Sequence, residues 1–400
     1  MLCPSAAVSL RRPYLLLLLL FFLLHISIHR RSFGTSLASL LPSLSGYHNK
    51  RRGRGAMTSR RFVNLVVHHI TGRPAPLSIH RINPANLFYQ IGSTVPTQGS
   101  AELLATMEDV PLPPAQITFE WPSAPVHTMD FSAFSRNRDK IICMDSLGRA
   151  VLYDFASSCI SSTILPNMPQ KVRQPMSVAV GDNCLFFMSD EDPHFMALMD
   201  GRDPNSNYIS KPNWCWASFQ RPPFASRSCD KNKISAYTVV GKSQIWVSTV
   251  GAGTFTFDPE SGAWNKAGDW ALPFRGRVEY VPEHNLWFGF SHKDKHLCAS
   301  DLTAVSTVRP PVPQKRWKDL VWPEDWKLVS TQLLPLGSGK LCIVRFFRIS
   351  EEAEDFFEPD KINNFVVLAG VEAVYREGGL CFIKHKSERY SLGRDFANAL

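Results

Sequence analysis

Four stretches of the chain share one plan, and together they decide the fold. Each contains an apolar strand, a short polar or glycine-containing turn and a second strand that ends in aspartate: KIICMDSLGRAVLYD (140–154), CLFFMSDEDPHFMALMD (184–200), QIWVSTVGAGTFTFD (244–258) and LWFGFSHKDKHLCASD (286–301). The closing aspartates, Asp154, Asp200, Asp258 and Asp301, are 46, 58 and 43 residues apart. A recurrence of about 50 residues is the length of a four-stranded blade of a β-propeller.

The segments around these hairpins complete the repeated unit. Three hairpins follow another strand-like stretch, namely SVAV (177–180), ISAYTVV (234–240) and VEYV (278–281). Short turns connect these stretches to the hairpins, as antiparallel neighbours require. A tryptophan-bearing segment follows two of the hairpins, NWCWASFQRPP (213–223) and AWNKAGDWALP (263–273). We therefore expect each unit to hold three strands, the third ending in aspartate, and an outer strand that carries tryptophan.

Both ends of the body add further strands. Residues 61–70 and 76–90 are expected to form a strand pair, and 329–347, 365–375 and 379–392 at least one more hairpin-rich unit. No stretch after Met57 has helical periodicity over three turns. The prediction is an all-β propeller over residues 57–400, with six blades and with seven as the alternative. Pairing of the N-terminal and C-terminal strands would close the ring and remove exposed sheet edges.

The distribution of charge argues against a nucleic-acid partner. The chain carries a formal net charge of +9, from 44 basic and 35 acidic residues. Twelve of the basic residues and none of the acidic ones precede Glu102, which leaves 32 basic against 35 acidic residues in the remainder. A near-neutral body lacks the basic patch that binds a polyanion, so no nucleic-acid partner is expected.

The cysteines indicate a reducing compartment. Nine of them are scattered along the chain without any C-x-x-C spacing, which favours neither a disulfide framework nor a zinc site. Cys342 lies in the apolar run LCIVRFF and is expected to be a small buried hydrophobe rather than a reactive thiol. The chain also contains no N-x-[ST] sequon.

Residues 1–56 form a leader that differs in composition from the body. Its apolar run, Tyr14–Leu24, extends weakly to Ile28 and is flanked by two arginine pairs. This run matches a signal-peptide core better than a full membrane span, which needs roughly 20 apolar residues. Retention of the run as a signal anchor stays open. The basic, acid-free composition also allows an organelle transit segment. A further interpretation is that Met57 is the native start, because strand-like sequence follows it immediately.

The location of the protein depends on that choice. With a start at Met57, a near-neutral body with reduced cysteines is expected in the cytoplasm or the nucleus. If residues 14–28 are retained as a membrane anchor, the larger basic cluster at 30–54 would keep the propeller on the cytosolic side. The propeller is therefore expected to face the cytosol in both cases, and cleaved secretion or organelle import would be the exceptions.

Two glycine-containing segments resemble phosphate-binding loops only superficially. LGSGKL (336–341) has Leu334 and Leu341 where a phosphate-binding loop needs glycine and a hydroxyl residue. GAG (251–253) lies between two strands and has no helix behind it to present amides to a phosphate. Both segments are therefore expected to be hairpin turns.

The histidines do not form a recognisable metal site. His68 and His69 are neighbours in a strand pattern, so they point to opposite faces and cannot bind one metal together. Three more surround the fourth hairpin without a carboxylate or cysteine cluster: His284, His292 and His296. No catalytic, cofactor-binding or metal-binding residue is assigned from the sequence, and no cofactor is expected.

Aromatic and acidic clusters supply the remaining candidate surfaces. The acidic group of residues 351–360 is expected to be a solvated surface loop: Glu351, Glu352, Glu354, Asp355, Glu358 and Asp360. Seven tryptophans could form a binding surface, but their repeat positions predict that most pack within the blades: Trp214, Trp216, Trp264, Trp270, Trp317, Trp322 and Trp326. Two or three on loops could serve as contact anchors.

Several segments resemble one plant-restricted family, known as domain of unknown function 1668, whose members look kelch-like. They are RRFVNLVV (60–67), MDF (129–131), GRAVLYD (148–154), GDWALPFRGRVEYVPEHNLWFGF (268–290) and KHKSERYSLG (384–393). The resemblance covers nearly all of residues 57–393, and its most specific part is 268–290. It implies a propeller that begins near Met57, and it implies no activity and no site residues. The paired glycines of the full kelch signature are absent from this chain.

The expected function is that of a non-catalytic, monomeric interaction scaffold that binds a protein or peptide on one propeller face. The absence of catalytic motifs and the suitability of radial repeats for presenting loops favour it. One alternative is an enzyme of hydrolase or lyase type with its site in the central channel. Another is a carbohydrate-binding module, which rests on the tryptophans alone.

Overall fold

The computed structural model describes most of the chain from residue 60 to residue 400. The leader, with its apolar run at 14–28, lies outside the described residues, as does the acidic stretch 352–360. Every strand belongs to one compact unit, Lys50–Asp200 together with Asn213–Leu400. The described residues are 60–70, 76–90, 107, 109–120, 129–135, 138–145, 147–155, 160–169, 172, 175–190, 194–201, 213–225, 233–317, 322–351 and 361–400.

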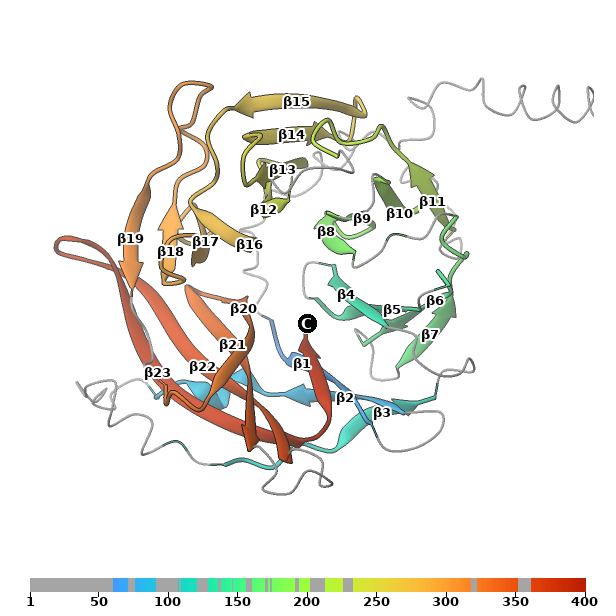
Figure 1. Ribbon diagram of the computed structural model, residues 1–400, viewed down its shortest axis with the longest axis vertical. Helices are drawn as coiled ribbons and strands as arrows, with labels where there is room; N and C mark the ends of the chain where they lie inside the picture. The colour runs from blue at the N-terminus through green and yellow to red at the C-terminus, as the bar shows by residue number, and fades with distance from the viewer. Residues whose placement is uncertain are drawn as a thin grey trace, which may run out of the picture. The chain divides into compact units, whose positions relative to one another are not determined.

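The described strands form six groups of four around a common centre (Figure 1). Four groups are separate sheets, and the other two join into one eight-stranded sheet. In five of the groups the first strand in the sequence lies nearest the centre and the fourth lies outermost, as β4–β7 (residues 130–164) and β8–β11 (residues 176–218) illustrate (Figure 1). The protein is an all-β propeller, as the sequence predicts. The blade count of the whole chain stays a prediction, six with seven as the alternative.

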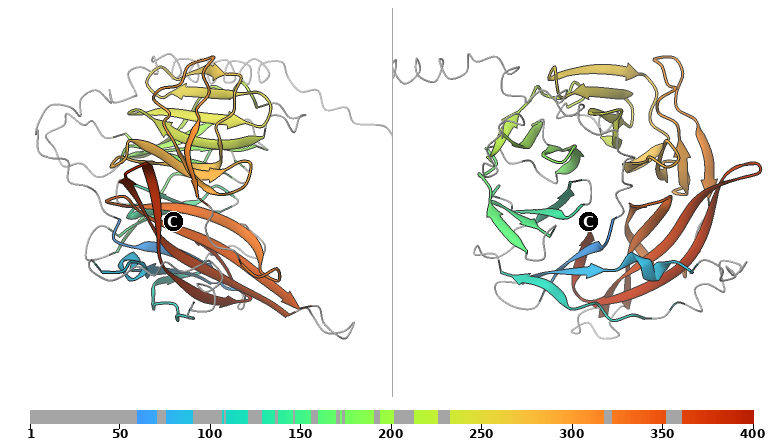
Figure 2. Two further views of the ribbon diagram at one scale, coloured as in Figure 1. Left: turned by 90° about the vertical axis from the view of Figure 1, so that its left-hand side faces the viewer. Right: turned by 180° about the vertical axis from the view of Figure 1, so that it is seen from behind.

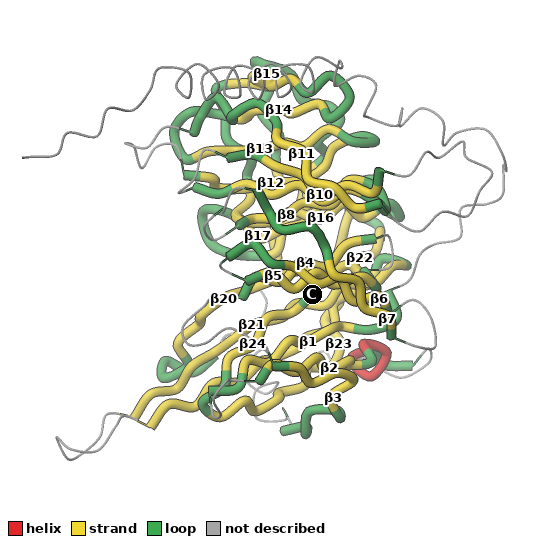
Figure 3. Tube along the Cα trace, turned by 90° about the vertical axis from the view of Figure 1, so that its right-hand side faces the viewer, coloured by secondary structure: helices red, strands yellow, loops and turns green. Residues whose placement is uncertain are grey.

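Successive groups follow the chain in order, and one 3-10 turn, η3 (Pro84–Leu87), is the only helical segment among the described residues (Figure 3). The strands are β1 (Val63–His68), β2 (Leu77–Ile82), β3 (Ala115–Phe119), β4 (Asp130–Phe134), β5 (Lys140–Met144), β6 (Ala150–Asp154), β7 (Ser161–Ile164), β8 (Met176–Val180), β9 (Cys184–Met188), β10 (Met196–Asp200), β11 (Trp214–Ser218), β12 (Ile234–Val240), β13 (Gln244–Thr249), β14 (Thr254–Asp258), β15 (Ala263–Gly268), β16 (Phe274–Val281), β17 (Leu286–Ser291), β18 (Leu297–Ser300), β19 (Pro313–Trp317), β20 (Lys327–Gly337), β21 (Lys340–Glu351), β22 (Lys361–Arg376), β23 (Gly379–Gly393) and β24 (Phe396–Ala399).

Strands from the two ends of the chain close the ring. β24 pairs antiparallel with β1, and β2 and β3 continue the same sheet outward. Two backbone hydrogen bonds extend this pairing: the amide of Asn64 donates to Leu400 at 3.2 Å, and the amide of Leu400 donates to Asn64 at 2.8 Å. The predicted pairing of N-terminal and C-terminal strands is confirmed.

Six hydrophobic clusters fill the spaces between neighbouring groups, one for each neighbouring pair. Between β5 and β9, for example, Ile142 packs in one cluster with Leu185 and Phe187. Adjacent residues of one strand serve two clusters: Leu65 and Val66 of β1 lie in different ones. This alternation is the period of two that a strand buried on both faces requires, and it explains why the strands read as continuous apolar runs.

The repeated hairpins of the sequence are the two middle strands of four groups: β5–β6, β9–β10, β13–β14 and β17–β18. The recurring aspartate shapes the turn that leads to the outer strand. Oδ1 of Asp258 accepts from the amide of Glu260 at 3.1 Å, and Oδ1 of Asp301 accepts from the amide of Thr303 at 2.7 Å. A carboxylate that binds the amide two residues ahead makes an Asx turn, so these two aspartates have a local chemical role, whereas Oδ1 of Asp200 accepts from the more distant amide of Asn213 at 3.1 Å.

Tryptophan indoles link successive groups. Each Nε1 donates to a backbone carbonyl of a neighbouring group: Trp216 to Pro166 at 2.8 Å, Trp264 to Gln220 at 3.0 Å and Trp270 to Ser306 at 3.0 Å. Each indole therefore combines a packed ring with a satisfied polar edge. These contacts agree with the interpretation of the tryptophans as packing residues.

The sheet β20–β23 is longer than the others. Its strands have 11 to 16 residues, and they project beyond the ring (Figure 2). An aromatic cluster of Trp322, Trp326, Phe347 and Phe365 packs on this sheet, separate from the six clusters between the groups. Within the described part of the chain, no helix has the length and apolar character that a membrane crossing needs.

Candidate ligand site at the centre of the propeller

Four charged side chains from distant parts of the sequence interact at the inner side of the ring. Arg60 precedes β1, Arg138 lies in the turn between β4 and β5, and Arg277 and Glu279 belong to β16. Ion pairs join Glu279 to Arg138 and to Arg277, and electrostatic interactions link Arg60 with the other three. We call these residues the central charged cluster.

The pairing register of β16 determines the positions of Arg277 and Glu279, the two cluster residues on this strand. Arg275 pairs with Phe290 and Glu279 with Phe288, so three residues of β16 stand opposite the single residue Gly289. Such a bulge bends a strand and redirects its side chains. Gly289 leaves room beneath it, because a Cβ there would lie 3.0 Å from the ring of Phe274 and would press against it.

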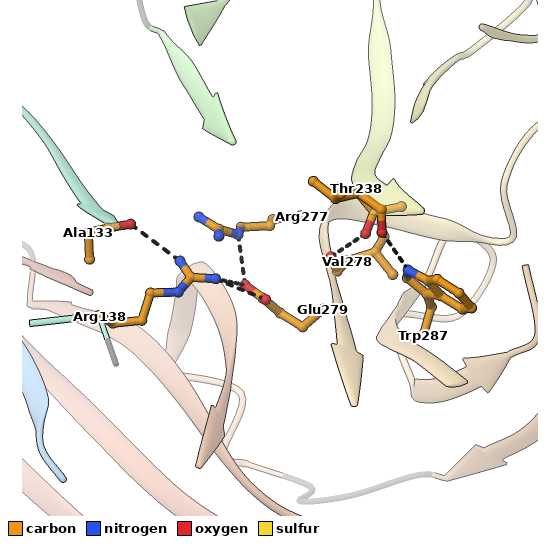
Figure 4. A network of polar contacts seen from close by, with 8 residues as sticks. Ala133, Arg138, Thr238, Arg277, Val278, Glu279 and Trp287 are labelled. Carbon is orange, nitrogen blue, oxygen red and sulfur yellow. Dashed lines mark hydrogen bonds and ion pairs between the residues drawn. The ribbon is translucent and has the colours of Figure 1, made fainter. Parts of the chain in front are cut away.

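The displaced residues of β16 bond to the neighbouring group instead. Gly276 adopts a φ of 72°, and Tyr237 and Arg277 are partners in a short parallel pairing of β12 with β16. The hydroxyl of Thr238 donates to the carbonyl of Val278 at 2.8 Å (Figure 4). This pairing joins two blades into the eight-stranded sheet and holds Arg277 beside the centre.

Glu279 is bound by two guanidinium groups (Figure 4). Nη2 of Arg138 donates to both carboxylate oxygens, at 3.2 and 3.1 Å, and Nε of Arg277 lies 2.7 Å from Oε1. Nη1 of Arg138 reaches the carbonyl of Ala133 at 3.4 Å. The exposed fractions of the side chains are 11% for Glu279, 18% for Arg138 and 28% for Arg277, so the group is largely withdrawn from solvent.

A constrained turn presents Arg138. The backbone of Arg138 has a φ of 54° and that of Ser135 a φ of 78°, both in the left-handed region that non-glycine residues rarely adopt. Hydrogen bonds hold this conformation: the amide of Arg138 donates to Ser135 at 3.2 Å, and the hydroxyl of Ser135 donates to Asp139 at 2.5 Å. Conformations of this kind are concentrated at functional positions.

Arg60 is the most deeply buried member of the cluster. Its exposed fraction is 6%, and its backbone amide donates to the carbonyl of Leu336 at 3.1 Å. Nε and Nη1 of its guanidinium are buried without a hydrogen-bond partner among the described residues. A buried charge without hydrogen bonds is costly, and native proteins rarely retain one without a use for it.

Burial and mutual repulsion shift the pKa values of these groups. Burial, and then the charge of Arg138, lowers the pKa of Arg60 to about 9, against an opposing effect of Glu279. Burial and then Arg277 lower the pKa of Arg138 to about 10. Burial alone would raise the pKa of Glu279, but the three arginines outweigh it and the net shift is downward. The cluster thus has a surplus of positive charge around one ionised carboxylate.

This arrangement suits binding rather than proton transfer. A general base needs a pKa near the working pH and access to a substrate proton, whereas Glu279 is held ionised with two guanidinium groups on its oxygens. Guanidinium groups bind carboxylates and phosphates through planar, charge-assisted hydrogen bonds. The chemistry that the cluster can perform is therefore recognition of an anion.

A second polar network has the spacing of a catalytic triad, but its serine also contacts a second histidine. Nδ1 of His69 lies 2.7 Å from Asp395 and its Nε2 lies 2.7 Å from Oγ of Ser78. Oγ also lies 2.8 Å from Nε2 of His80, whose Nδ1 lies 2.7 Å from the carbonyl of Pro113. A carbonyl only accepts, so Nδ1 of His80 donates to it. The single proton of Ser78 is therefore placed between two imidazole nitrogens, and His80 competes with His69 for it.

That network fastens the closing sheet instead. Ser78 has an exposed fraction of 2%, which leaves no approach for a substrate. Asp395 also accepts from the amide of Ile70 at 2.9 Å, so one carboxylate ties the end of β1 to the residue before β24. We call the residues Asp395, His69, Ser78 and His80 the closing network.

The glycine-containing segments occupy the places that the sequence predicts. GAG (251–253) lies between β13 and β14, and LGSGKL (336–341) spans the turn between β20 and β21. Gly337, Ser338 and Gly339 all have positive φ, as a tight hairpin turn requires. The amide of Ser338 donates to the carboxylate of Glu283. Both segments are hairpin turns.

The histidines of the sequence analysis have separate partners. His68 packs edge-on against Phe131, whereas its neighbour His69 belongs to the closing network. Nε2 of His284 lies 2.9 Å from the carbonyl of Ala373, and His296 lies beside Asp294. Among the residues that the structure describes, no three His, Cys, Asp or Glu side chains are grouped as a metal site would need.

No sequence pattern predicted the central charged cluster. Glu279 is a charged residue within the expected strand 278–281 and Arg277 immediately precedes that strand, and this was the available signal. Alternation of charged and apolar residues in a strand normally indicates a solvent face. Arg60 and Arg138 have no local signal, because their roles depend on contacts across the ring.

Four-stranded sheets around a shared centre, closed by pairing of the two chain ends, define a β-propeller, here with a charged cluster at its inner side. The chain belongs to the family described as protein of unknown function (DUF1668), whose sequence profile matches residues 60–390. The bulged strand of the cluster lies inside the segment 268–290, which is the most specific part of the resemblance noted in the sequence.

Solved propellers are similar to this chain at low identity. The Cps50 (Swd1) β-propeller domain of Myceliophteria thermophila matches with a TM-score of 0.37 and 10% identity, over 81% of this chain and 96% of that one. Kluyveromyces lactis Hsv2 matches with a TM-score of 0.35 and 8% identity, over 83% and 96%. The WD40 domain of SCAP from fission yeast matches with a TM-score of 0.30 and 9% identity, over 86% and 88%. No curated protein matches the chain.

Proposed function

We propose that this protein is a non-catalytic interaction scaffold that binds a protein or peptide partner on one face of its propeller. The observation that carries the proposal is the central charged cluster, in which three arginines surround a single carboxylate. Its members come from separate segments of the ring, so the folded propeller assembles a recognition site that no single loop provides. The cluster supplies binding groups and, in Glu279, a carboxylate that is unsuited to act as a base.

Affinity purification of the full-length chain from its native cells tests the proposal. The wild-type bait is compared with two variants. Arg277→Gln removes one guanidinium group of the cluster, and Arg309→Gln is a matched change in the exposed turn before β19. We expect the same partner with the wild type and with R309Q, and at least tenfold less of it with R277Q. Turnover of a substrate in a broad screen, without a stable partner, would reverse the proposal in favour of an enzyme.

A hydrolase is the second candidate, because the distances between Asp395, His69 and Ser78 match those of a triad. A fluorophosphonate reagent distinguishes the two, since it modifies only an activated and accessible serine. With Ser78 buried and in contact with His80 as well as His69, we expect no labelling of the wild type. Labelling that is lost in Ser78→Ala would establish the hydrolase.

The proposed location follows the choice of start site. We propose that the propeller faces the cytosol whether translation begins at Met57 or whether residues 14–28 anchor the chain, because the basic residues at 30–54 favour that side. Mass spectrometry of the mature N-terminus and protease protection of isolated membranes test this. Protection of the body inside vesicles, or cleavage between Ser32 and Ser45, would overturn it.

A further inference from the structure

The charges of the central charged cluster do not balance. Arg60, Arg138 and Arg277 contribute three positive charges, and Glu279 contributes one negative charge. Tyr237 and Cys342, two other titratable groups that interact with the cluster, are kept neutral, since burial is the largest cause of the raised pKa of each. The four side chains of the cluster therefore carry a surplus of two positive charges in a largely buried setting.

Two donors of Arg60 have no hydrogen-bond acceptor among the residues that the structure describes. Nε and Nη1 are buried and unpartnered among the described residues, while the side chain as a whole is more than nine-tenths buried. The carboxylate of Glu279 is already occupied by Arg138 and Arg277. An additional anion would meet the free donors of Arg60 and would reduce the repulsion that lowers the pKa of the neighbouring arginines.

The structure assigns the central charged cluster as a binding site for a phosphate group, with Arg60, Arg138 and Arg277 as its ligands. A surplus of two charges matches a phosphate monoester, which carries about −1.5 to −2 at neutral pH, better than a carboxylate, which carries −1. Guanidinium forks suit its oxygens. The inference rests on the proposed function in one respect: the phosphate is taken to belong to a phosphorylated residue of the partner.

Thermal unfolding of the full-length protein in inorganic phosphate tests the site itself. A ligand that binds only the folded state raises the unfolding temperature progressively with its concentration. We expect this rise for the wild type and for R309Q, measured against chloride at equal ionic strength. In Arg60→Gln and Arg277→Gln the apparent affinity for phosphate is expected to fall roughly 10- to 100-fold, because each change removes a charge-assisted hydrogen bond.

Two readouts separate binding from a structural role. Without phosphate, R60Q is expected to unfold at the same or a higher temperature than the wild type, because it removes a buried unpaired charge. Arg277→Lys keeps the charge but not the planar fork, so it should recover only part of the affinity. If phosphate stabilises all variants equally, or if R60Q and R277Q are both merely less stable and respond normally to phosphate, the inference is wrong.

Peptides identify the source of the phosphate. A degenerate phosphoserine and phosphothreonine library is expected to bind the wild type and to be displaced by inorganic phosphate, whereas the same library without phosphate should not bind. If only free phosphate binds, the site serves a small molecule, so the partner assignment fails while the phosphate site stands. If a partner co-purifies but is retained by R277Q and is not displaced by phosphate, the scaffold stands and the phosphate site is wrong.

Discussion

At the scale of single residues, the side chains of the closing network are expected to contribute more to the stability of the fold than their polar character alone indicates. The hydroxyl of Ser78 stands between two histidine nitrogens, and Asp395 contacts both His69 and the backbone at Ile70. Each group has its partner within a mostly buried setting, and His80 has an exposed fraction of 9%. Loss of the Ser78 hydroxyl removes the partner of two imidazole nitrogens at once, and a buried polar atom left without a hydrogen bond costs more than the bond itself contributes.

Replacement of Ser78 by alanine should therefore destabilise the protein by about 1–3 kcal/mol, because it leaves a nitrogen of His69 and one of His80 unpaired. Urea denaturation followed by tryptophan fluorescence measures this. Ser161→Ala on the exposed strand β7 is the control, and it should change the free energy of unfolding by less than about 0.5 kcal/mol. Equal effects of the two substitutions would contradict the role given to the network.

Cysteine chemistry at the residue scale follows from burial. Cys342 is fully buried, and burial is the main reason that its pKa is raised to about 12. We expect iodoacetamide at pH 8 to leave Cys342 unmodified in the folded protein and to modify it after denaturation, since the thiolate is the nucleophile. Cys215, on the exposed side of β11, is the internal control that should react first. Mass spectrometry of the peptides follows both, and equal rates would be inconsistent with a buried thiol.

At the scale of elements, three tryptophans link successive groups of strands: Trp216, Trp264 and Trp270. Trp264 of β15 packs against Phe195, Phe224 and Phe257, and it donates from its indole to Gln220 at 3.0 Å. The carbohydrate-binding alternative depended on free tryptophan faces, and the face of Trp264 is engaged in packing between groups. Trp264 is thus a structural element of the ring.

Trp264→Phe keeps an aromatic ring in place but removes the hydrogen bond to Gln220. We expect a loss of about 1 kcal/mol in the free energy of unfolding. Trp246→Phe is a matched control, because the indole nitrogen of Trp246 is buried and has no partner among the described residues. That change should cost less than Trp264→Phe or even stabilise the protein. The reverse order in urea denaturation would show that the linkage between sheets does not depend on the hydrogen bond.

For the whole molecule, closure of the ring is the decisive feature. β24 is short, yet it gives β1 its inner neighbour and places Leu400 against the cluster of β1, β5 and β6. An unpaired β1 would present a free edge to other chains. Residues 395–400 are therefore expected to contribute more to the stability of the closed ring than their number suggests.

Deletion of residues 395–400 should abolish cooperative unfolding of the monomer and cause self-association, because it removes both the strand pairing and the carboxylate of the closing network. Thermal unfolding and light scattering after size-exclusion chromatography measure these effects. Phe396→Ala is the control, since this side chain is 48% exposed and its loss leaves the backbone pairing intact. A truncated chain that stays monomeric and unfolds at the wild-type temperature would contradict this account of closure.

The sequence by itself determined the repeated unit. Apolar strands, turn glycines and the recurring aspartates are local signals, because hairpin turns and Asx turns depend on residues within a few positions of each other. Strands β8 to β18 and β20 to β23 follow those signals closely. β7, with the sequence SSTI, and β4 were not predicted, since they are short and their pairing partners, rather than an apolar pattern, make them strands.

Only the tertiary structure decided which charged side chains lie close together. Arg60, Arg138 and Glu279 are separated by up to 219 positions, and their association depends on the ring and on the bulge in β16. A charged residue in a strand looks the same in sequence whether it faces water or the centre of a propeller. The closing network has the same origin, because His69 and Asp395 lie at opposite ends of the body and meet only when the ring closes. Non-local contacts are a property of the closed fold, so no local sequence pattern predicts them.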